Sequence, residues 1–342
     1  MKAWQLKRIA DLKQEAAPLE LVEVKPPGSD KNELLVKVSC CGICHTELDE
    51  IEGRTPPPRF PVIPGHQVVG LVQETGSSVT KFHRGDRIGI AWIYSACGTC
   101  EFCKAGKENL CPNFKGTGRD ANGGYAEYMT VNENFACSIP GAFTDLEAAP
   151  FLCAGAIGYR ALRLANVNDG DVLGLTGFGA SGHLVLKTTR YLFPNSRILV
   201  FARSKEEQKF AISLGATWAG GIQDNPPFFS HAIIDTTPAW KPVLASLKNL
   251  KPGGRLVINA IRKEQTDKDE LLELDYPMHL WMEKEIKSVA NITVKDVEEF
   301  LVLAAKIPIR SNVQTYSFEQ ANEALLDLKN KPVQGAKVLL VS

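Results

Sequence analysis

Two residues with the chemistry of metal ligands stand out in the N-terminal part of the chain, Cys44 and His66. A thiolate and an imidazole both suit a borderline-soft ion such as zinc. The segment between them, residues 55–64, is rich in proline, and fixed φ angles stiffen this loop and deliver His66 with little freedom left to lose. A third ligand must come from elsewhere, and Cys153 is the best remaining candidate. Two sulfurs and one nitrogen would leave one corner of a tetrahedral site open for water or substrate. The alternative is that Cys44, His66 and Cys153 bind no metal and are ordinary interior residues.

A second group of thiols lies between residues 97 and 111, where four cysteines fall within fifteen positions. These are Cys97, Cys100, Cys103 and Cys111. The two-residue spacings let neighbouring sulfurs face one ion, and four thiolates would close the site, so its role would be structural. Unligated cysteines and an iron–sulfur cluster are the weaker alternatives, because exposed thiols invite oxidation and cluster spacings usually continue differently.

A glycine-rich segment follows an expected strand and opens an expected helix, which is the context of a dinucleotide-binding turn. It consists of Gly177, Phe178, Gly179, Ala180, Ser181 and Gly182. Its glycines would allow a tight turn, close approach of the backbone to a pyrophosphate, and close packing of the helix on the sheet. A glycine turn without a ligand is the alternative.

The choice of cofactor is expected to depend on the end of the next strand, where the chain has Ala202, Arg203 and Ser204. A carboxylate there would hold the ribose 2′-hydroxyl of NAD, whereas an arginine and a hydroxyl suit a 2′-phosphate. NADP is therefore favoured over NAD. The alternative is that Arg203 and Lys205 only form a solvated helix start.

The elements that would position these residues change character along the chain. The first 140 residues predict short strands, among them 19–24, 33–39, 68–72 and 125–131, and a capping box at Thr144 predicts a helix running toward Cys153. From Asp171 onward, strands (172–176, 197–202, 232–235, 255–259) alternate with helices (179–192, 204–214, 239–250), which predicts a doubly wound parallel sheet. Helices at 294–305 and 318–328 and strands at 313–316 and 337–341 follow and could belong to either part.

The composition narrows the classes of partner. The chain has 342 residues, 44% of them apolar, and 39 basic residues balance 39 acidic ones. A net charge of zero gives no attraction to nucleic acid or to an anionic membrane, and no apolar run has the ~18 residues of a membrane span. We expect a small neutral substrate, no nucleic-acid or membrane partner, and a cytoplasmic location, where clustered thiols indicate metal binding rather than disulfides.

Taken together, these motifs make the chain resemble the zinc-dependent alcohol dehydrogenases of the medium-chain dehydrogenase/reductase family over essentially its full length. The matching features are Cys44-His45-Thr46, Gly65-His66, the four-cysteine segment, Leu152-Cys153-Ala154-Gly155, the glycine turn and Leu250–Arg255. The resemblance implies an α/β protein with a GroES-like, β-rich catalytic domain at 1–154 and 291–342. A Rossmann domain with a doubly wound parallel sheet would be inserted at 155–290.

The resemblance also implies roles for single residues. Cys44, His66 and Cys153 would hold a catalytic zinc, and the four clustered cysteines a structural zinc. Thr46 matches a hydroxyl residue that touches the substrate oxygen, and His45 sits where the family often contacts the pyrophosphate. Trp92 matches an aromatic residue that narrows the pocket for small primary alcohols.

Two positions depart from the family pattern. Gln67 replaces the common glutamate after the ligand histidine, which puts the route of ligand exchange at zinc in doubt. Asp49 stands where many relatives end their proton relay in a histidine, and we expect it to take that place.

The activity implied is reversible hydride transfer between a small, primary alcohol or its aldehyde and NAD(P). A polyol or cinnamyl-type alcohol dehydrogenase is the alternative within enzymes, and a redox sensor that binds zinc and nucleotide without turnover is the alternative of another class. Family members are dimers or tetramers, so a homo-oligomer is expected by analogy.

Overall fold

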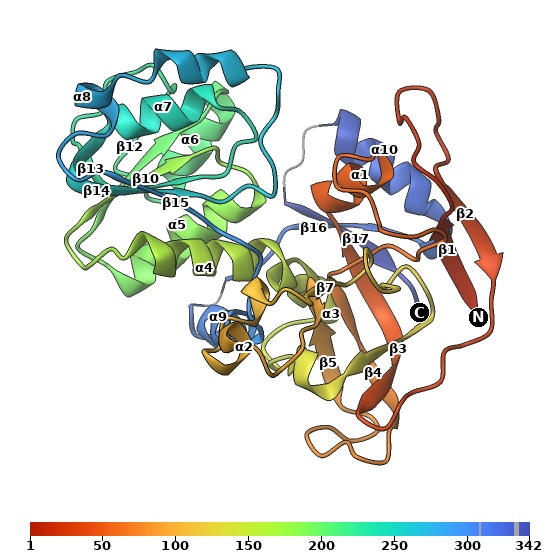
Figure 1. Cartoon of the computed structure of the whole chain (residues 1–342). Coiled ribbons are helices and arrows are strands. Elements are labelled where there is room, and N and C mark those ends of the chain that lie inside the picture. The colour runs from red at the N-terminus through yellow and green to blue at the C-terminus, as the bar shows by residue number, and fades with distance from the viewer. Residues whose placement is uncertain (308, 332–334) are drawn as a thin grey trace. The chain divides into compact units, whose positions relative to one another are not determined.

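The computed structural model describes residues 1–307, 309–331 and 335–342, and the chain divides into two compact units. One unit combines Met1–Ala156 with Ile292–Ser342, and the other is Ile157–Asn291. Both ends of the chain lie in the first unit (Figure 1). No helix within the described ranges is long and apolar enough to cross a membrane.

The first unit is built on a seven-stranded sheet with the order β16-β17-β3-β4-β5-β9, and β8 also pairs with β3. Its longest strand, β3 (Glu33–Ile43), is largely buried, and Leu34, Val36 and Val38, which share one face of the strand, all enter the core. The other strands of this unit are β1 (Lys2–Leu6), β2 (Leu19–Glu23), β4 (Val68–Thr75), β5 (Arg87–Ile90), β6 (Ile93–Ser95), β7 (Lys115–Gly116), β8 (Tyr128–Asn132), β9 (Ala136–Ser138), β16 (Val313–Tyr316) and β17 (Ala336–Leu340).

Short helices and turns position several of the chemistry-bearing residues of this unit. Cys44 is the N-cap of α1 (His45–Ile51), and the predicted capping box is confirmed, since the Thr144 side chain accepts from the backbone N–H of Glu147 at the start of α3 (Asp145–Ala148). A 3-10 turn, Ala149–Leu152, then ends at Cys153. The remaining helices are α2 (Glu101–Lys104), α9 (Val294–Lys306) and α10 (Ala321–Asn330), with 3-10 turns at Glu108–Leu110, Glu133–Phe135 and Phe318–Gln320.

The second unit is a six-stranded parallel sheet with the order β12-β11-β10-β13-β14-β15, which confirms the predicted doubly wound fold. Helices cover both faces: Leu162 and Val185 from α4 and α5 pack on Leu173 and Leu175, while α7 packs on β13 and β14 in a separate cluster. The strands are β10 (Val172–Thr176), β11 (Arg197–Phe201), β12 (Trp218–Gly220), β13 (Ser230–Asp235), β14 (Leu250–Ile258) and β15 (Glu285–Ser288). The helices are α4 (Ala154–Ala165), α5 (Ala180–Leu192), α6 (Lys205–Ser213), α7 (Lys241–Lys248) and α8 (Tyr276–His279), with a 3-10 turn at Lys268–Glu273.

Several predicted bounds were wrong. The strand expected at 125–131 is Tyr128–Asn132, and the helix expected at 239–250 is only Lys241–Lys248, because Leu250 already pairs with Ser230 as the start of β14. The short strands β12 and β15 were missed. Each has three or four residues and little alternation, so its strand state depends on pairing with a neighbour rather than on its own sequence.

Candidate active site

Cys44, His66 and Cys153 come together in the first unit, although they lie far apart in the sequence. Their ligand atoms all lie within 4.8 Å of one another. The His66 Nε2 atom is 3.6 Å from the sulfur of Cys44 and 3.3 Å from that of Cys153. The start of α1, the 3-10 turn after α3 and the segment before β4 each contribute one ligand. The three predicted ligands therefore converge on one point, as a tetrahedral site with an open corner requires.

The carboxylate of Glu47 fixes the orientation of His66, and the sequence reasoning missed this residue. Glu47 Oε1 lies 2.6 Å from His66 Nδ1, and both side chains are buried. The other oxygen, Oε2, accepts the backbone N–H of Cys44 at 2.9 Å. A proton on Nδ1 that is donated to Glu47 leaves the lone pair of Nε2 for a metal, which is the usual arrangement behind a histidine ligand.

The group brings together acidic side chains whose ionised forms are disfavoured by burial and by one another. The neighbouring Cys153 and burial raise the pKa of the Cys44 thiol well above its usual value. Burial and then Glu47 raise the pKa of Glu50, which lies buried on the same helix. Burial lowers the pKa of His66, but Glu47 and Cys44 outweigh it and hold this pKa well above normal. A divalent cation would relieve this repulsion, so the donor set fits a zinc ion.

The other predicted residues of the site lie on α1 or next to His66. Thr46 is partly buried and its backbone N–H donates to the Cys44 sulfur at 3.4 Å, while His45 is exposed. Asp49 is buried and forms an ion pair with the Arg54 side chain. The ring of Trp92 meets that of His66 edge on, with centroids 5.0 Å apart.

Gln67 is buried directly after His66. Its side-chain nitrogen has no hydrogen-bond partner among the described residues. A buried amide nitrogen without a hydrogen-bond partner lowers the free energy of unfolding, so Gln67 does not make the fold as stable as it could be.

The four clustered cysteines also converge, with all four sulfurs within 4.8 Å of one another. Backbone N–H groups of Cys100, Cys103 and Asn113 point at three of the sulfurs, at 3.4 to 3.5 Å. The backbone N–H groups of Thr99 and Cys100 lower the pKa of Cys97 to about 5, whereas desolvation and the neighbouring thiols raise that of Cys103 to about 12. Four thiols at this distance fit one closed metal site.

In the second unit, the glycine turn leads from β10 into α5. Gly177 has a φ of 81°, and a Cβ atom on Gly182 would lie 2.9 Å from the carbonyl oxygen of Gly177. No side chain caps the start of α5, and the space beside Gly179 is open. Phe178 is buried and Ala180 is the first helical residue. The unpaired N–H groups of the helix start therefore fit a phosphate.

At the end of β11, Ala202 is buried and Arg203 is exposed. Ser204 is the N-cap of α6, where its hydroxyl accepts the backbone N–H of Glu207 at 3.1 Å. The hydroxyl keeps a proton that it can donate, but Arg203 is the stronger candidate for a 2′-phosphate.

Two sulfurs and one imidazole that fit a metal ion in one unit, and a glycine turn that fits a phosphate at the switch point of a doubly wound sheet in the other, are typical of metal- and dinucleotide-dependent dehydrogenases. Residues 30–141 match the family model described as the alcohol dehydrogenase GroES-like domain. A protein of Mycobacterium tuberculosis named "Probable alcohol dehydrogenase AdhA" is 41% identical over 346 residues, which cover 100% of this chain and 97% of that protein.

An alcohol dehydrogenase of Geobacillus stearothermophilus is 33% identical, over 94% of this chain and 95% of that protein. A cinnamyl alcohol dehydrogenase of Sorghum bicolor superposes with a TM-score of 0.84 at 26% identity, over 99% of this chain and 97% of the other. The chain therefore belongs to the zinc-dependent alcohol dehydrogenases of the medium-chain dehydrogenase/reductase family. This confirms the predicted resemblance and its combination of a GroES-like and a Rossmann fold.

Proposed function

We propose that this chain oxidises a small primary alcohol, or reduces the corresponding aldehyde, with one catalytic zinc and NADP as cofactor. The observation that carries the proposal is the convergence of Cys44, His66 and Cys153, with Glu47 holding the imidazole so that Nε2 faces the two sulfurs. A redox sensor without turnover would not need an open coordination position beside a hydroxyl residue such as Thr46.

The residues of the first unit would divide the chemistry among them. Cys44, His66 and Cys153 would hold the zinc ion, which would supply Lewis acidity to lower the pKa of a substrate hydroxyl group. Thr46 would accept the proton of that hydroxyl at Oγ1, and Asp49 would end the relay that carries the proton away. Asp49 is buried on the same helix as Thr46 and pairs with the Arg54 guanidinium, which fixes the position of its carboxylate.

The four-cysteine group would hold a second, structural zinc, which gives two per chain. Four ligands leave no open position, so this ion would brace the loop that runs from β6 to β7 rather than take part in the reaction.

The second unit would bind the cofactor, whose nicotinamide ring takes or gives the hydride. The N–H groups at the start of α5 would contact the pyrophosphate. Arg203, with Ser204, would hold a 2′-phosphate, so NADP is proposed over NAD. Ala202 leaves this strand end without the carboxylate that would repel such a phosphate.

The substrate is proposed to be small because Trp92 packs edge on against His66 at the metal site. Cinnamyl alcohol dehydrogenase 2 of Arabidopsis thaliana is 31% identical over 323 residues, which favours an aromatic alcohol as the second candidate. Initial rates with ethanol, benzyl alcohol, cinnamyl alcohol and a polyol would separate these candidates.

We also propose a division into domains, self-association and a cellular location for the chain. The catalytic domain would be 1–154 with 291–342, and the cofactor domain 155–290; the two compact units support this division. The exposed edge strand β15 supports self-association as a dimer or tetramer. A cytoplasmic location fits nine cysteines that form no disulfide in the structure.

The decisive experiment measures turnover with NAD and NADP on a short primary alcohol, together with the zinc content. Cys153→Ala should abolish turnover and remove one of two zinc ions, whereas Cys137→Ala, at a buried cysteine outside both metal groups, should leave both unchanged. Full activity in Cys153→Ala, or active protein with zinc only at the four cysteines, would refute the proposal.

A further inference from the structure

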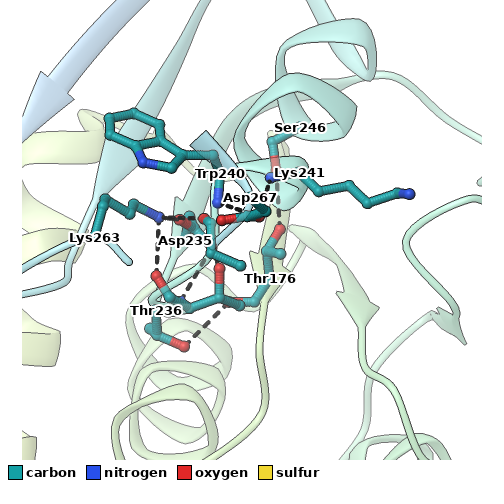
Figure 2. Close-up of polar contacts among 10 residues, drawn as sticks. Thr176, Asp235, Thr236, Trp240, Lys241, Ser246, Lys263 and Asp267 are labelled. Carbon is teal, nitrogen blue, oxygen red and sulfur yellow. Dashed lines mark hydrogen bonds and ion pairs between the residues drawn. The ribbon is translucent and has the colours of Figure 1, made fainter. Parts of the chain in front are cut away.

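A buried ion pair lies at the carboxyl end of β13 in the second unit. The Lys263 Nζ atom donates to Asp235 Oδ2 at 2.5 Å and to the carbonyl oxygens of Thr237 and Ala239 at 2.8 and 2.9 Å (Figure 2). The side chain of Asp235 is 0% exposed and that of Lys263 is 9% exposed. All three ammonium protons have acceptors, and each acceptor belongs to the segment 235–239.

A second side chain that holds this segment, the carboxylate of Asp267, lies close to Lys263 in the sequence. Asp267 Oδ2 accepts the backbone N–H groups of Trp240 and Lys241, at 2.7 and 3.0 Å, just where α7 begins (Figure 2). The segment 263–267 therefore grips the segment 235–241 through a cation at one end and an anion at the other. We call Asp235, Lys263 and Asp267 the clasp.

The segment held by the clasp forms one wall of the glycine turn. Thr236 donates to the carbonyl oxygen of Thr176 from its backbone N–H at 2.9 Å and from its hydroxyl at 3.1 Å. A Cβ atom on Gly177 would lie only 2.6 Å from the Thr236 hydroxyl oxygen. The other carboxylate oxygen of Asp235, Oδ1, accepts hydrogen bonds from both the backbone N–H and the hydroxyl of Thr237. Asp235 thus connects the lysine to the residues that line the turn.

The position of this wall determines what it can contact. The strand order reverses between β10 and β13, and a doubly wound sheet binds a dinucleotide across that point. One mononucleotide half belongs to β10, β11 and β12, where Arg203 follows β11, and the other half belongs to β13, β14 and β15. The clasp joins the loops that follow β13 and β14, so it lies in the half opposite the one that contains Arg203.

We propose that Lys263 and Asp235 are positioning residues for the nicotinamide mononucleotide half of the cofactor, an inference that rests on the proposed function. They hold the backbone of 236–239 in place before the cofactor arrives, so that this loop need not be ordered on binding. Burial raises the pKa of Asp235 although Lys263 lowers it, so the carboxylate depends on the ammonium for its charge. Removing the lysine would release two carbonyl groups and leave a buried acid unpaired.

A purely structural ion pair would affect all ligands of the unit alike, and this difference makes the proposal testable. The test measures dissociation constants for the reduced dinucleotide that the wild type binds more tightly, NADPH or NADH, by fluorescence. The adenosine half alone, 2′,5′-ADP or ADP, is titrated in parallel by calorimetry. No turnover is required for either measurement.

The principal variant is the double substitution Asp235→Asn with Lys263→Met, which removes both charges and keeps the volumes similar. We expect the dinucleotide to bind about tenfold more weakly and the adenosine half to bind within about twofold of wild type, since only the first contacts the clasped loop. The single variant Lys263→Arg keeps a cation beside Asp235 and should bind the dinucleotide about as tightly as the wild type. Lys248→Met removes an exposed cation at the other end of α7, outside the clasped segment, and it should change neither constant.

If the double variant does not fold, Asp267→Asn tests the contacts of Asp267 alone and should show the same selectivity with a smaller loss. Equal weakening of both ligands, or unchanged binding of the dinucleotide, would overturn the inference while leaving the proposed function intact. A wild type that binds neither dinucleotide would overturn the proposed function, and the role of the clasp with it.

Discussion

At the scale of single residues, the site depends on a carboxylate that binds no metal in our proposal. Glu47 joins the backbone of one ligand, Cys44, to the ring of another, His66. One helix start therefore sets both the position of a sulfur and the tautomer of an imidazole. Because the imidazole must present Nε2 as a lone pair, loss of this hydrogen bond would weaken the metal site without removing a ligand.

We expect Glu47→Gln to lower the zinc affinity of this site by about 10- to 100-fold, since a neutral amide supports the imidazole less well than a carboxylate. Competition with a chelator, followed by the zinc content, measures the effect. Glu74→Gln, at an exposed residue of β4, is the matched control and should hold zinc like the wild type. Equal zinc retention in the two variants would show that Glu47 only caps the helix.

Arg203 is the residue on which the choice of cofactor should depend. Arg203→Ala is expected to weaken NADP binding about tenfold, or by about 1.4 kcal/mol, and to leave NAD binding nearly unchanged. Dissociation constants for both cofactors, measured at one salt concentration, give the result. Lys205→Ala is the control, because that ammonium donates to Gln208 on its own helix at 3.0 Å. A parallel loss for NAD and NADP would mean that Arg203 binds no 2′-phosphate.

At the scale of elements, the sequence predicted those whose pattern is local. The alternation of strands and helices after Asp171 and the capping box at Thr144 both depend on residues a few positions apart, and both are found in the structure. The convergence of the three ligands could be anticipated only because cysteine and histidine are scarce and conspicuous. Short strands such as β15 give no such local pattern and are stabilised by pairing.

The charged residues that support the site escaped prediction for a physical reason. Glutamate and lysine are mostly found at protein surfaces. The sequence does not show that Glu47 is buried against His66, 19 positions away, or Lys263 against Asp235, 28 positions away. Only one hint was present for Glu47, since Cys44 and Glu47 have the spacing of a capping box with cysteine in place of serine.

The turn between β10 and α5 gives a prediction at this scale. Gly177→Ala should destabilise the second unit by about 1–3 kcal/mol, because alanine at positive φ is strained, and should also weaken dinucleotide binding through the clash with Thr236. Gly170→Ala is the control, since Gly170 has a φ of 92° with open space around it. It should lower thermal stability and leave the dissociation constant unchanged. Similar dissociation constants for both variants would contradict a role for the turn in binding.

At the scale of the whole molecule, the second unit exposes an edge that invites a partner. All four residues of β15 are exposed, and the strand has β14 on one side and no described strand on the other. Large apolar side chains close to it in the sequence are also exposed, Tyr276, Trp281 and Met282 among them. An open strand edge beside apolar surface is a site where a second copy can add its own edge.

Ile286 lies within this edge and is 48% exposed, so its replacement by lysine tests the proposed self-association. A charge there would meet its own copy across a two-fold interface, and we expect Ile286→Lys to shift the protein from dimer or tetramer toward smaller species in sedimentation velocity. Leu71→Lys adds the same charge at a residue 42% exposed on β4 of the first unit and should leave the distribution unchanged. Because each subunit carries its own three ligands and glycine turn, the dissociated variant should still bind zinc and dinucleotide; loss of both would mean that the interface supports the fold rather than only the assembly.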